Sequence, residues 1–401
     1  MKNILNIFLI SCFSFTVISC SARDHEHDST ATTTTTIDTT TINFVGGTAS
    51  GFVLTSADGT NWTLRETAAT NPIIDVIYAN SKYVAVGYYG IILTSSDGIS
   101  WDNRTTATSD YHWGVTYGNS KFVTVGGYGR NYYSSDGTTW TAGTINNTNF
   151  LYGIIYGNSK FVAVGGSGTI ITSSDGTSFD NSTSSGTSEE LRDVTYGNNT
   201  FVTVGGSGTI LTSTDGTTWT SRTSGTGISI LGVQYVNSTF VAVGRGGLIL
   251  TSSDGTTWTS KTSGTTDNLT GVTYGNSTFV SVGDNGTILT SSDATTWTSR
   301  TSGKTSHLYG VTYAYSKFMT VGASGVILHS SDGTTWTQRE WRSPEDVFYG
   351  VTHGIDKDSN EIFMLVSDEG GILSFCSDFN CSLSSGETSN QCCNHYGVIF
   401  G

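Results

Sequence analysis

Short runs of β-branched and aromatic residues, separated by Gly, Asn and Asp, recur along most of the chain. Read from Leu269, one unit contains the segments LTGVTYGN, STFVSVG, GTILTSSD and TTWTSR. Such runs are typical of strands joined by tight turns, so each unit predicts four antiparallel strands, A to D. No stretch of the sequence has the apolar spacing of an amphipathic helix, and we expect almost no helix.

The units repeat with a period of about 39 residues. An aspartate marks each copy between strands C and D, where Asp-Gly favours a tight hairpin turn with positive φ. It is found at Asp58, Asp97, Asp136, Asp175, Asp215, Asp254, Asp293 and Asp332, with a degenerate ninth copy at Asp378. Copy seven has Asp293-Ala294 in place of Asp-Gly, and we expect that turn to be strained or altered.

Four-stranded units of this length predict an all-β fold, a single closed β-propeller over residues 42–401, because one such sheet cannot bury both of its faces alone. The propeller region begins with a B-like segment at 42–46 and ends with an A-like segment at 395–400. Pairing of these two segments in one sheet would make the two ends share the closing blade. We expect about nine blades, with eight and an irregular end as the alternative.

The segment TSSDGTTW at 251–258 resembles the Asp-box, or BNR repeat, of sialidase-type and photosystem-assembly-factor-like propellers. In the usual pattern, Ser-x-Asp-x-Gly-x-x-Trp, the Asp lies two positions before the Gly. Here Ser253 takes that position and Asp254 directly precedes Gly255. The resemblance covers the chain after residue 41 and implies a propeller, but such hairpins occur in hydrolases, assembly factors and receptors alike.

The N-terminal segment is typical of export. Lys2 precedes a mainly apolar run at 4–18, which is too short for a membrane-spanning helix. The run ends in Val-Ile-Ser-Cys at 17–20, which resembles the lipobox of bacterial lipoproteins. This predicts a signal peptide at 1–19, a lipid anchor on Cys20, an unfolded Thr-rich tether at 20–41, and a periplasmic or surface-exposed place in the bacterial cell envelope. An ordinary signal peptide that happens to end in Cys is the alternative.

Four cysteines cluster near the C-terminus, at Cys376, Cys381, Cys392 and Cys393. In an oxidising compartment they predict two disulfides. Bonding between the adjacent Cys392 and Cys393 is strained, so we expect each to join one of the other two. A zinc site that includes His395 is the alternative.

Charge and motifs exclude several functions. The formal net charge is −14 and the Lys and Arg residues are scattered, which argues against nucleic-acid binding and leaves the lipid as the only membrane contact. The sequence has no serine-nucleophile elbow, phosphate loop or zinc signature, so we expect no catalytic residues, metal or cofactor. A divergent sialidase-like glycan hydrolase is the runner-up, although the Arg-Ile-Pro segment usual in sialidases is absent.

The repeated residues have structural interpretations. Each turn offers a single carboxylate, whereas calcium takes six to eight oxygens, so we expect the aspartates to cap their own turns. One aromatic residue per copy follows the turn and is expected to pack there. These residues are Trp62, Trp101, Trp140, Phe179, Trp219, Trp258, Trp297 and Trp336.

Binding residues are expected where the copies differ. The connections from B to C and from D to A vary, and both emerge on the face opposite the Asp-Gly hairpins. They supply the candidates Tyr89, His112, Trp113, Arg130, Arg245, Asp284 and His307. We therefore predict a monomer that presents this face to a protein or glycan ligand. An assembly factor for a membrane complex is a further alternative.

Overall fold

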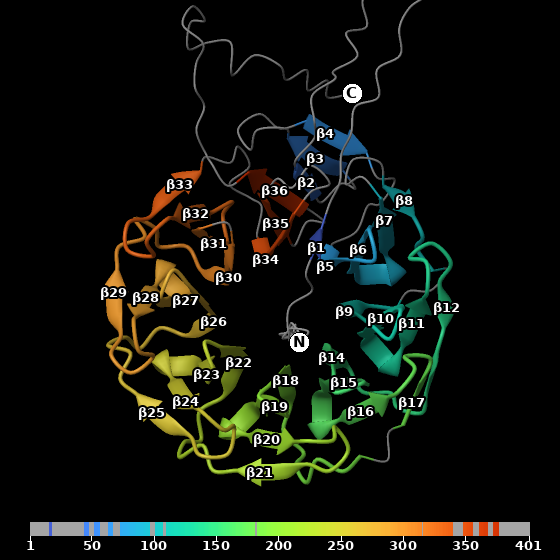
Figure 1. Ribbon diagram of the computed structural model, residues 1–401, viewed down its shortest axis with the longest axis horizontal. Coiled ribbons are helices and arrows are strands. Elements are labelled where there is room, and N and C mark those ends of the chain that lie inside the picture. Colours follow the sequence, from blue (N-terminus) through green and yellow to red (C-terminus); the bar gives the residue numbers. More distant parts are fainter. Residues whose placement is uncertain are drawn as a thin grey trace, which may run out of the picture.

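The computed structural model describes residues 73–96, 101–106, 110–180, 183–314 and 316–339. It also describes the backbone of the strands at 16–17, 44–47, 52–56, 63–66, 348–355, 361–367 and 372–376. The protein is an all-β propeller of four-stranded antiparallel sheets, with about seven to eight blades (Figure 1). In each four-stranded blade strand A lies nearest the central axis and strand D lies at the rim.

Seven blades follow one another in the chain, and we number them from the first. Blade 1 is β5–β8 (Ile73–Ala79, Lys82–Gly87, Ile92–Ser95, Asp102–Asn103), blade 2 is β9–β12 (His112–Gly118, Lys121–Gly126, Asn131–Ser134, Thr141–Ala142) and blade 3 is β14–β17 (Leu151–Gly157, Lys160–Gly165, Ile170–Ser173, Ser178–Phe179). Blade 4 is β18–β21 (Leu191–Gly197, Thr200–Gly205, Ile210–Ser213, Thr220–Arg222) and blade 5 is β22–β25 (Ile230–Val236, Thr239–Gly244, Ile249–Ser252, Thr259–Lys261). Blade 6 is β26–β29 (Leu269–Gly275, Thr278–Gly283, Ile288–Ser291, Thr298–Arg300) and blade 7 is β30–β33 (Leu308–Ala314, Lys317–Gly322, Ile327–Ser330, Thr337–Arg339).

Blade 3 departs from the regular pattern at its rim. Its strand β17 pairs in parallel with β13 (Thr144–Ile145), which follows β12 of blade 2. A single bridge between Thr172 and Asp180 continues the antiparallel pairing with β16. The rims of blades 2 and 3 are therefore joined by backbone hydrogen bonds.

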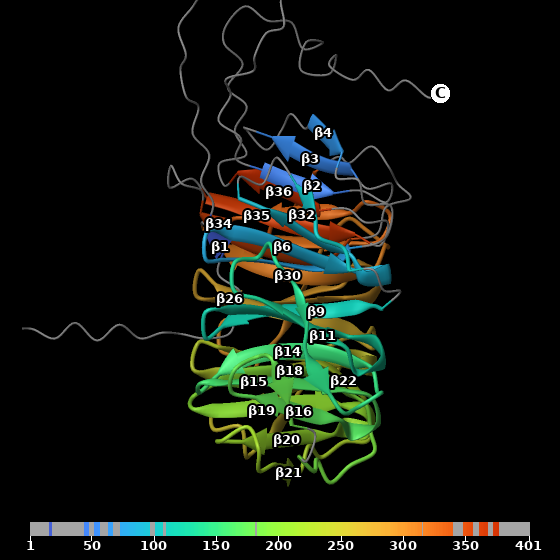
Figure 2. The same ribbon diagram turned by 90° about the vertical axis from the view of Figure 1, so that its right-hand side faces the viewer.

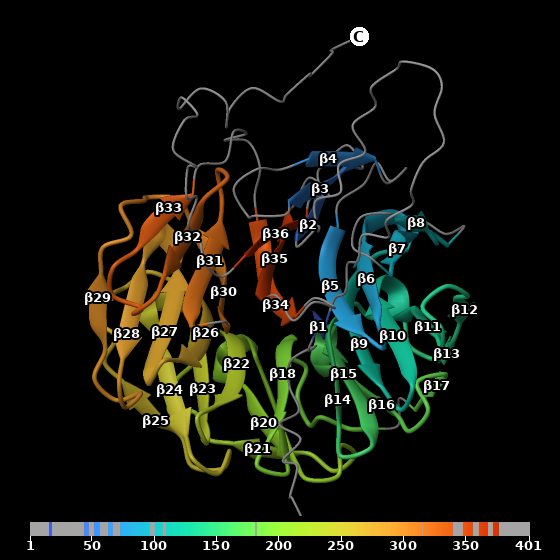
Figure 3. The same cartoon turned by 45° about the horizontal axis from the view of Figure 1, so that its top comes forward.

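Two further sheets lie where the ends of the propeller region come together. The sheet β34–β36 (Phe348–Ile355, Glu361–Ser367, Ile372–Cys376) lies between blade 7 and blade 1, and β1 (Thr16–Val17) pairs in parallel with β34. The sheet β2–β4 (Phe44–Gly47, Phe52–Ser56, Thr63–Glu66) lies outside the ring beside β36 in all three views (Figures 1, 2 and 3). The structure does not confirm nine blades, and segment 395–400, expected to close the ring, lies outside the described residues.

The core lies between neighbouring sheets, because strand B of each blade is buried on both faces. Between blades 4 and 5, for example, Val202 and Val204 pack against Ile230, Phe240 and Leu250. Each blade contributes one large side chain from the start of strand B: Tyr83, Phe122, Phe161, Phe201, Phe240, Phe279 and Phe318. Packing against the next blade buries the apolar face that a single four-stranded sheet would leave exposed.

The C–D hairpins of blades 2 to 7 confirm the predicted role of the turn aspartates, whereas Asp58, Asp97 and Asp378 lie outside the described residues. Asp254 Oδ1 accepts the backbone N–H groups of Thr256 at 2.7 Å and Thr257 at 2.9 Å. The bond from Thr257 N–H, together with those from Thr256, lowers the pKa of Asp254. Among the described residues, no three His, Cys, Asp or Glu side chains gather as metal ligands do.

The described recurrent tryptophans pack as expected, whereas Trp62 lies outside the described residues. Trp258 Nε1 donates to the Gly255 carbonyl oxygen at 2.8 Å, and its ring lies 6.4 Å from that of Phe240. Ala294 has a φ of +58° at the position where Gly255 has +75°, so the turn of copy seven is the strained one, as predicted. Helix within the described residues is limited to six one-turn 3-10 segments, η1 to η6.

Candidate ligand-binding surface

In blades 1 to 6 the B–C connection is a 3-10 turn, and the D–A segments beside it hold it in place. In blade 1 the turn is η1 (Tyr88–Gly90), and the N–H of Gly90 donates to the carbonyl oxygen of Asp110, just before β9. In blade 2 the turn is η2 (Gly127–Gly129), and the N–H of Gly127 donates to the Tyr111 carbonyl oxygen at 2.8 Å. The segment Asp110–Tyr111 therefore joins the turns of two blades.

The central residue of these turns has a left-handed backbone conformation. Blades 3 to 6 use Ser167, Ser207, Gly246 and Asn285 there, within η3 (Gly166–Gly168), η4 (Gly206–Gly208), η5 (Arg245–Gly247) and η6 (Asp284–Gly286). Blades 1 and 2 instead have Tyr89 at φ +56° and Tyr128 at +55°, although this conformation costs a bulky residue about 1–2 kcal/mol. Strain held at exposed residues is a mark of functional positions.

The two tyrosines belong to one cluster of rings, which we call the aromatic surface. It consists of Tyr88, Tyr89, Tyr111, Trp113, Tyr128, Phe150 and Tyr152, from blades 1 to 3. The Tyr111 ring centroid lies 4.9 Å from that of Tyr88 and 5.5 Å from that of Tyr89. A Cβ on Gly127 would meet both the Tyr111 and Phe150 rings, so this glycine lets the rings of neighbouring blades come close.

Exposure makes this surface available to a ligand. The side chains of Tyr89 and Tyr128 are 48% and 55% exposed, and among the described residues the other exposed large hydrophobic residue is Ile228, in a different blade. Burial raises the pKa of Tyr88, and hydrogen bonding to Tyr89 raises the pKa of Tyr111. Tyrosine hydroxyl groups are neutral near pH 7 even without such shifts, so both groups can donate hydrogen bonds there.

A charged pair borders the aromatic surface. Arg130, directly after η2, places its Nε 3.7 Å from Asp110 Oδ2, and the Arg130 side chain is 62% exposed. The hydroxyl group of Tyr132 donates to the same carboxylate oxygen at 3.5 Å. Arginine and tyrosine beside exposed rings are the residue types that dominate binding energy at protein interfaces.

The structure brings three of the seven predicted residues together, namely Tyr89, Trp113 and Arg130. His112 does not belong to the face: it is fully buried between blades 1 and 2, so its prediction as a ligand contact is wrong. The inner strand contains a β-bulge at this point, which turns Trp113 toward the rings and His112 into the core.

The other three predicted residues lie in blades 5 to 7. Arg245 is exposed in η5. Asp284 Oδ1 lies 2.9 Å from His307 Nδ1, so these two residues pair between blades 6 and 7. Asn268 Nδ2 also donates to the Asp284 carboxylate at 2.7 Å. Both oxygens of this carboxylate therefore have partners within the protein.

The seven candidates do not include Tyr88, Tyr111, Tyr128, Phe150 and Tyr152, although all of these except Tyr152 lie in the variable B–C and D–A connections where binding residues were expected. A signal for Tyr128 was present, because an aromatic residue between two glycines in the B–C turn must adopt the left-handed conformation that Ser, Gly or Asn takes elsewhere. The gathering of the rings had no local signal, since they come from three blades.

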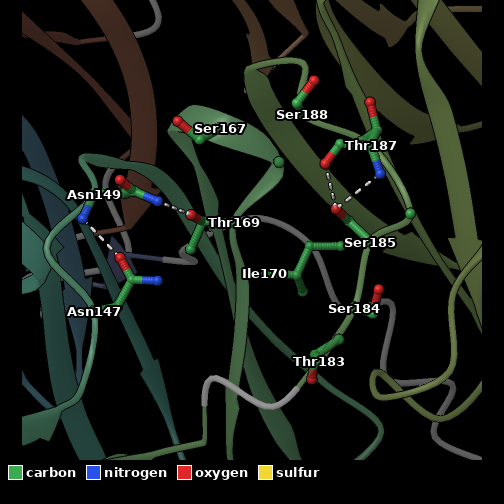
Figure 4. A pocket seen from close by; sticks show the side chains of 12 residues that line it. Asn147, Asn149, Ser167, Thr169, Ile170, Thr183, Ser184, Ser185, Thr187 and Ser188 are labelled. Atoms are coloured by element: carbon green, nitrogen blue, oxygen red, sulfur yellow. Dashed lines mark hydrogen bonds between the residues drawn. The ribbon is translucent and has the colours of Figure 1, made fainter.

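A polar pocket opens beside the aromatic surface, at blade 3. It is lined by Asn147, Asn149, Ser167, Thr169 and residues 183–188, with a volume of about 500 Å³ (Figure 4). The corresponding loops of blade 5 form a second pocket of about 630 Å³, lined by residues that include Ile228 and Leu248. Because the same loops produce both hollows, the pocket is a property of the repeat.

Burial raises the pKa of Asp193 to about 6. It lies in β18, at a position that is glycine in most blades. Its Oδ1 accepts the N–H of Val194 at 2.8 Å and its Oδ2 accepts that of Val233, in blade 5, at 2.9 Å. Asp75 accepts the N–H of Val115 at 2.9 Å in the same way. Both carboxylates tie inner strands together, so their role is structural.

Comparison with known proteins supports the fold. Residues 154–269 match the family model described as the DUF6242 beta propeller domain. A search of curated proteins finds no match. No helix in the described part of the chain is long and apolar enough to cross a bilayer.

Three solved propellers are similar in structure. YCF48 bound to D1 peptide shares 16% identity, covering 79% of this chain and 95% of that one, with a TM-score of 0.54. BamB from Moraxella catarrhalis shares 13% identity, covering 77% and 96%, with a TM-score of 0.57. Saccharomyces cerevisiae Sqt1 shares 11% identity, covering 77% and 97%, with a TM-score of 0.63. At these identities the likeness concerns the fold alone.

Proposed function

We propose that this propeller is a binding module, without catalytic activity, that docks a polypeptide on its aromatic surface. The observation that carries the proposal is the pair of exposed tyrosines, Tyr89 and Tyr128, held in a strained backbone conformation that smaller residues occupy in blades 3 to 6. Strained backbone positions cluster at active sites and ligand-binding sites.

The composition of the surface favours a polypeptide ligand. Tyrosine, tryptophan and arginine supply rigid apolar area together with hydrogen-bond donors, which is the usual make-up of protein interfaces. YCF48, which has a similar fold, has been solved with the D1 peptide bound. A glycan is the alternative ligand, because sugars also stack on exposed rings.

Selection from a random peptide library displayed on phage would test the proposal. The bait is the full-length protein in detergent, and the Tyr89→Ser/Tyr128→Ser double variant introduces the residue that blades 3 and 4 carry. Ser167→Gly/Ser207→Gly is the matched control, since Gly246 occupies that position in blade 5. Selected peptides should bind the tyrosine variant about tenfold more weakly than the wild type and the control equally well.

Two results would contradict polypeptide binding at this surface. Peptides that bind the wild type and the tyrosine variant alike would place the contact elsewhere. A library that yields no peptide, combined with binding on a glycan array that the tyrosine variant loses, would assign the surface to a sugar.

We also propose that the chain is exported, cleaved before Cys20 and lipid-anchored in the bacterial cell envelope, with 20–41 as its tether. Labelled fatty acid should be incorporated into the wild type and not into Cys20→Ser. Surface proteolysis of intact cells would then separate a periplasmic from an external position.

The ends of the propeller region carry a related proposal, that residues 395–400 supply the closing inner strand and that the four C-terminal cysteines form two disulfides. Mass spectrometry of non-reduced peptides would give the pairing. Light scattering should show a monomer.

A further inference from the structure

His112 takes a core position that is aliphatic in every other numbered blade. The corresponding residues are Ile73, Leu151, Leu191, Ile230, Leu269 and Leu308, all buried. The Nδ1 of His112 lies 3.2 Å from Thr124 Oγ1, whereas its Nε2 is buried without a hydrogen-bond partner among the described residues. A buried nitrogen in that state destabilises the fold, so the repeat alone does not explain why a histidine is kept here.

The exception extends along the same face of blade 2. Tyr132 stands where the other blades have Leu93, Ile171, Leu211, Leu250, Leu289 and Leu328. Its ring meets that of His112 edge to face, at 5.2 Å and 87°. A polar and aromatic pair therefore replaces two aliphatic residues in the core between blades 1 and 2.

The hydroxyl group of Thr124, beside His112 and Tyr132, does not make the hydrogen bond to strand A that its counterparts in other blades make. At its position in blades 4, 6 and 7, Thr203, Ser281 and Thr320 donate to the carbonyl oxygen of the third residue of strand A, at 2.8 to 3.0 Å. In blade 2 the Thr124 hydroxyl instead lies beside His112 and accepts the N–H of Tyr132 at 3.3 Å. Replacing His112 by leucine would free Thr124 for the bond that its counterparts make.

Contacts of Asp110 connect His112 and Tyr132 in the core to the aromatic surface. The Tyr132 hydroxyl group donates to Asp110, and the same carboxylate oxygen faces Arg130 Nε at 3.7 Å. The backbone oxygen of Asp110 also accepts the N–H of Gly90, in the turn that carries Tyr89. Asp110 therefore contacts Arg130 through its side chain and the turn of Tyr89 through its backbone.

We propose that His112 and Tyr132 are positioning residues: they hold Asp110, and through it Arg130 and the turn of Tyr89, in the arrangement that receives the ligand. Neither residue touches the ligand. The inference rests on the proposed function, since it explains an exceptional core residue in blade 2, which supplies three of the seven rings of the aromatic surface.

Three variants of the full-length protein test the inference. His112→Leu restores the residue of the other blades, and Tyr132→Phe removes only the hydroxyl group that reaches Asp110. Tyr133→Phe is the control, because Tyr133 is adjacent in β11 and packs on the opposite face, against the core between blades 2 and 3. Two readouts need no ligand: the thermal unfolding midpoint and hydrogen exchange of the Gly90 amide, with the Gly166 amide as internal reference.

His112→Leu should raise the unfolding midpoint by a few degrees. In both His112→Leu and Tyr132→Phe, the Gly90 amide should exchange several times faster relative to Gly166, and a peptide selected on the wild type should bind about tenfold more weakly. Tyr133→Phe should change neither exchange nor binding.

A lower unfolding midpoint or failure to fold in His112→Leu would overturn the inference, because His112 would then serve stability. Unchanged Gly90 exchange in both variants would also overturn it. If no peptide binds the wild type, the proposed function fails, while the exchange and unfolding results still decide whether His112 and Tyr132 position Asp110.

Discussion

Gly157 in blade 3 lies directly beneath the ring of Tyr196 in blade 4: a Cβ on Gly157 would stand 2.6 Å from Cγ of that ring. The same relationship recurs between Gly118 and Tyr156. Near the axis the inner strands converge, and a missing side chain on one blade makes room for a ring on the next. This contact sets how closely neighbouring blades approach.

Gly157→Ala should therefore lower the free energy of unfolding by about 1–3 kcal/mol, as overpacking does. In blade 5 the corresponding position already carries a side chain, that of Val236, and both Val236 and Tyr274 pack against the core between blades 5 and 6. Val236→Ala should cost about 1 kcal/mol through lost burial rather than through a clash. Urea denaturation of both variants measures the difference, and an unaffected Gly157→Ala would show that Tyr196 moves freely.

Asp193 should make stability depend on pH between about 4 and 6. Its folded pKa of about 6 lies above the ordinary value of 3.8, so the folded chain binds this proton more tightly. The stabilisation is complete below about pH 4 and is lost as the pH rises through 6, by at most about 3 kcal/mol. Asp193→Asn should remove this decline.

Chemical denaturation at a series of pH values measures the effect of Asp193. The turn aspartates, whose pKa values are lowered, titrate below this window and do not obscure it. If the free energy of unfolding depends on pH in the same way in the wild type and in Asp193→Asn, then Asp193 ionises normally in the fold.

Asp254→Ala should destabilise the hairpin of blade 5. The variant removes the acceptor of two backbone N–H groups, at a cost of about 1–2 kcal/mol at neutral pH. The lowered pKa means that the wild-type carboxylate stabilises the fold above about pH 4 and loses this effect on acidification. The difference between the two proteins in thermal unfolding should therefore shrink at pH 2, and a constant difference would contradict the role of the charge.

Tyr89→Gly should leave stability within about 1 kcal/mol of the wild type while it weakens ligand binding. Relief of the left-handed strain offsets the lost ring contact with Tyr111 and the greater freedom of glycine in the unfolded chain. Thermal unfolding checks the expected stability, and peptide affinity measured on the same preparation checks the expected loss of binding. A large loss of stability would mean that Tyr89 is kept for folding.

The sequence alone determined the repeat, the four strands of each unit and the propeller. These follow from local rules: β-branched residues favour strands, and the backbone of Asp-Gly suits the hairpin at Asp254. The capping by Asp254 and the packing of Trp258 were also predictable, because their partners lie within a few residues.

Only the tertiary structure decided which side chains form the candidate site. Aligning the copies places His112 where the others have an aliphatic core residue, but only the structure shows that the bulge turns Trp113 toward the rings of Tyr88 and Tyr152. Tyr89, Tyr111 and Phe150 come from different blades, and their meeting depends on how the sheets pack around the axis. Pairing between Asp284 and His307 likewise needs the approach of two blades, because a contact between repeats is a property of the ring.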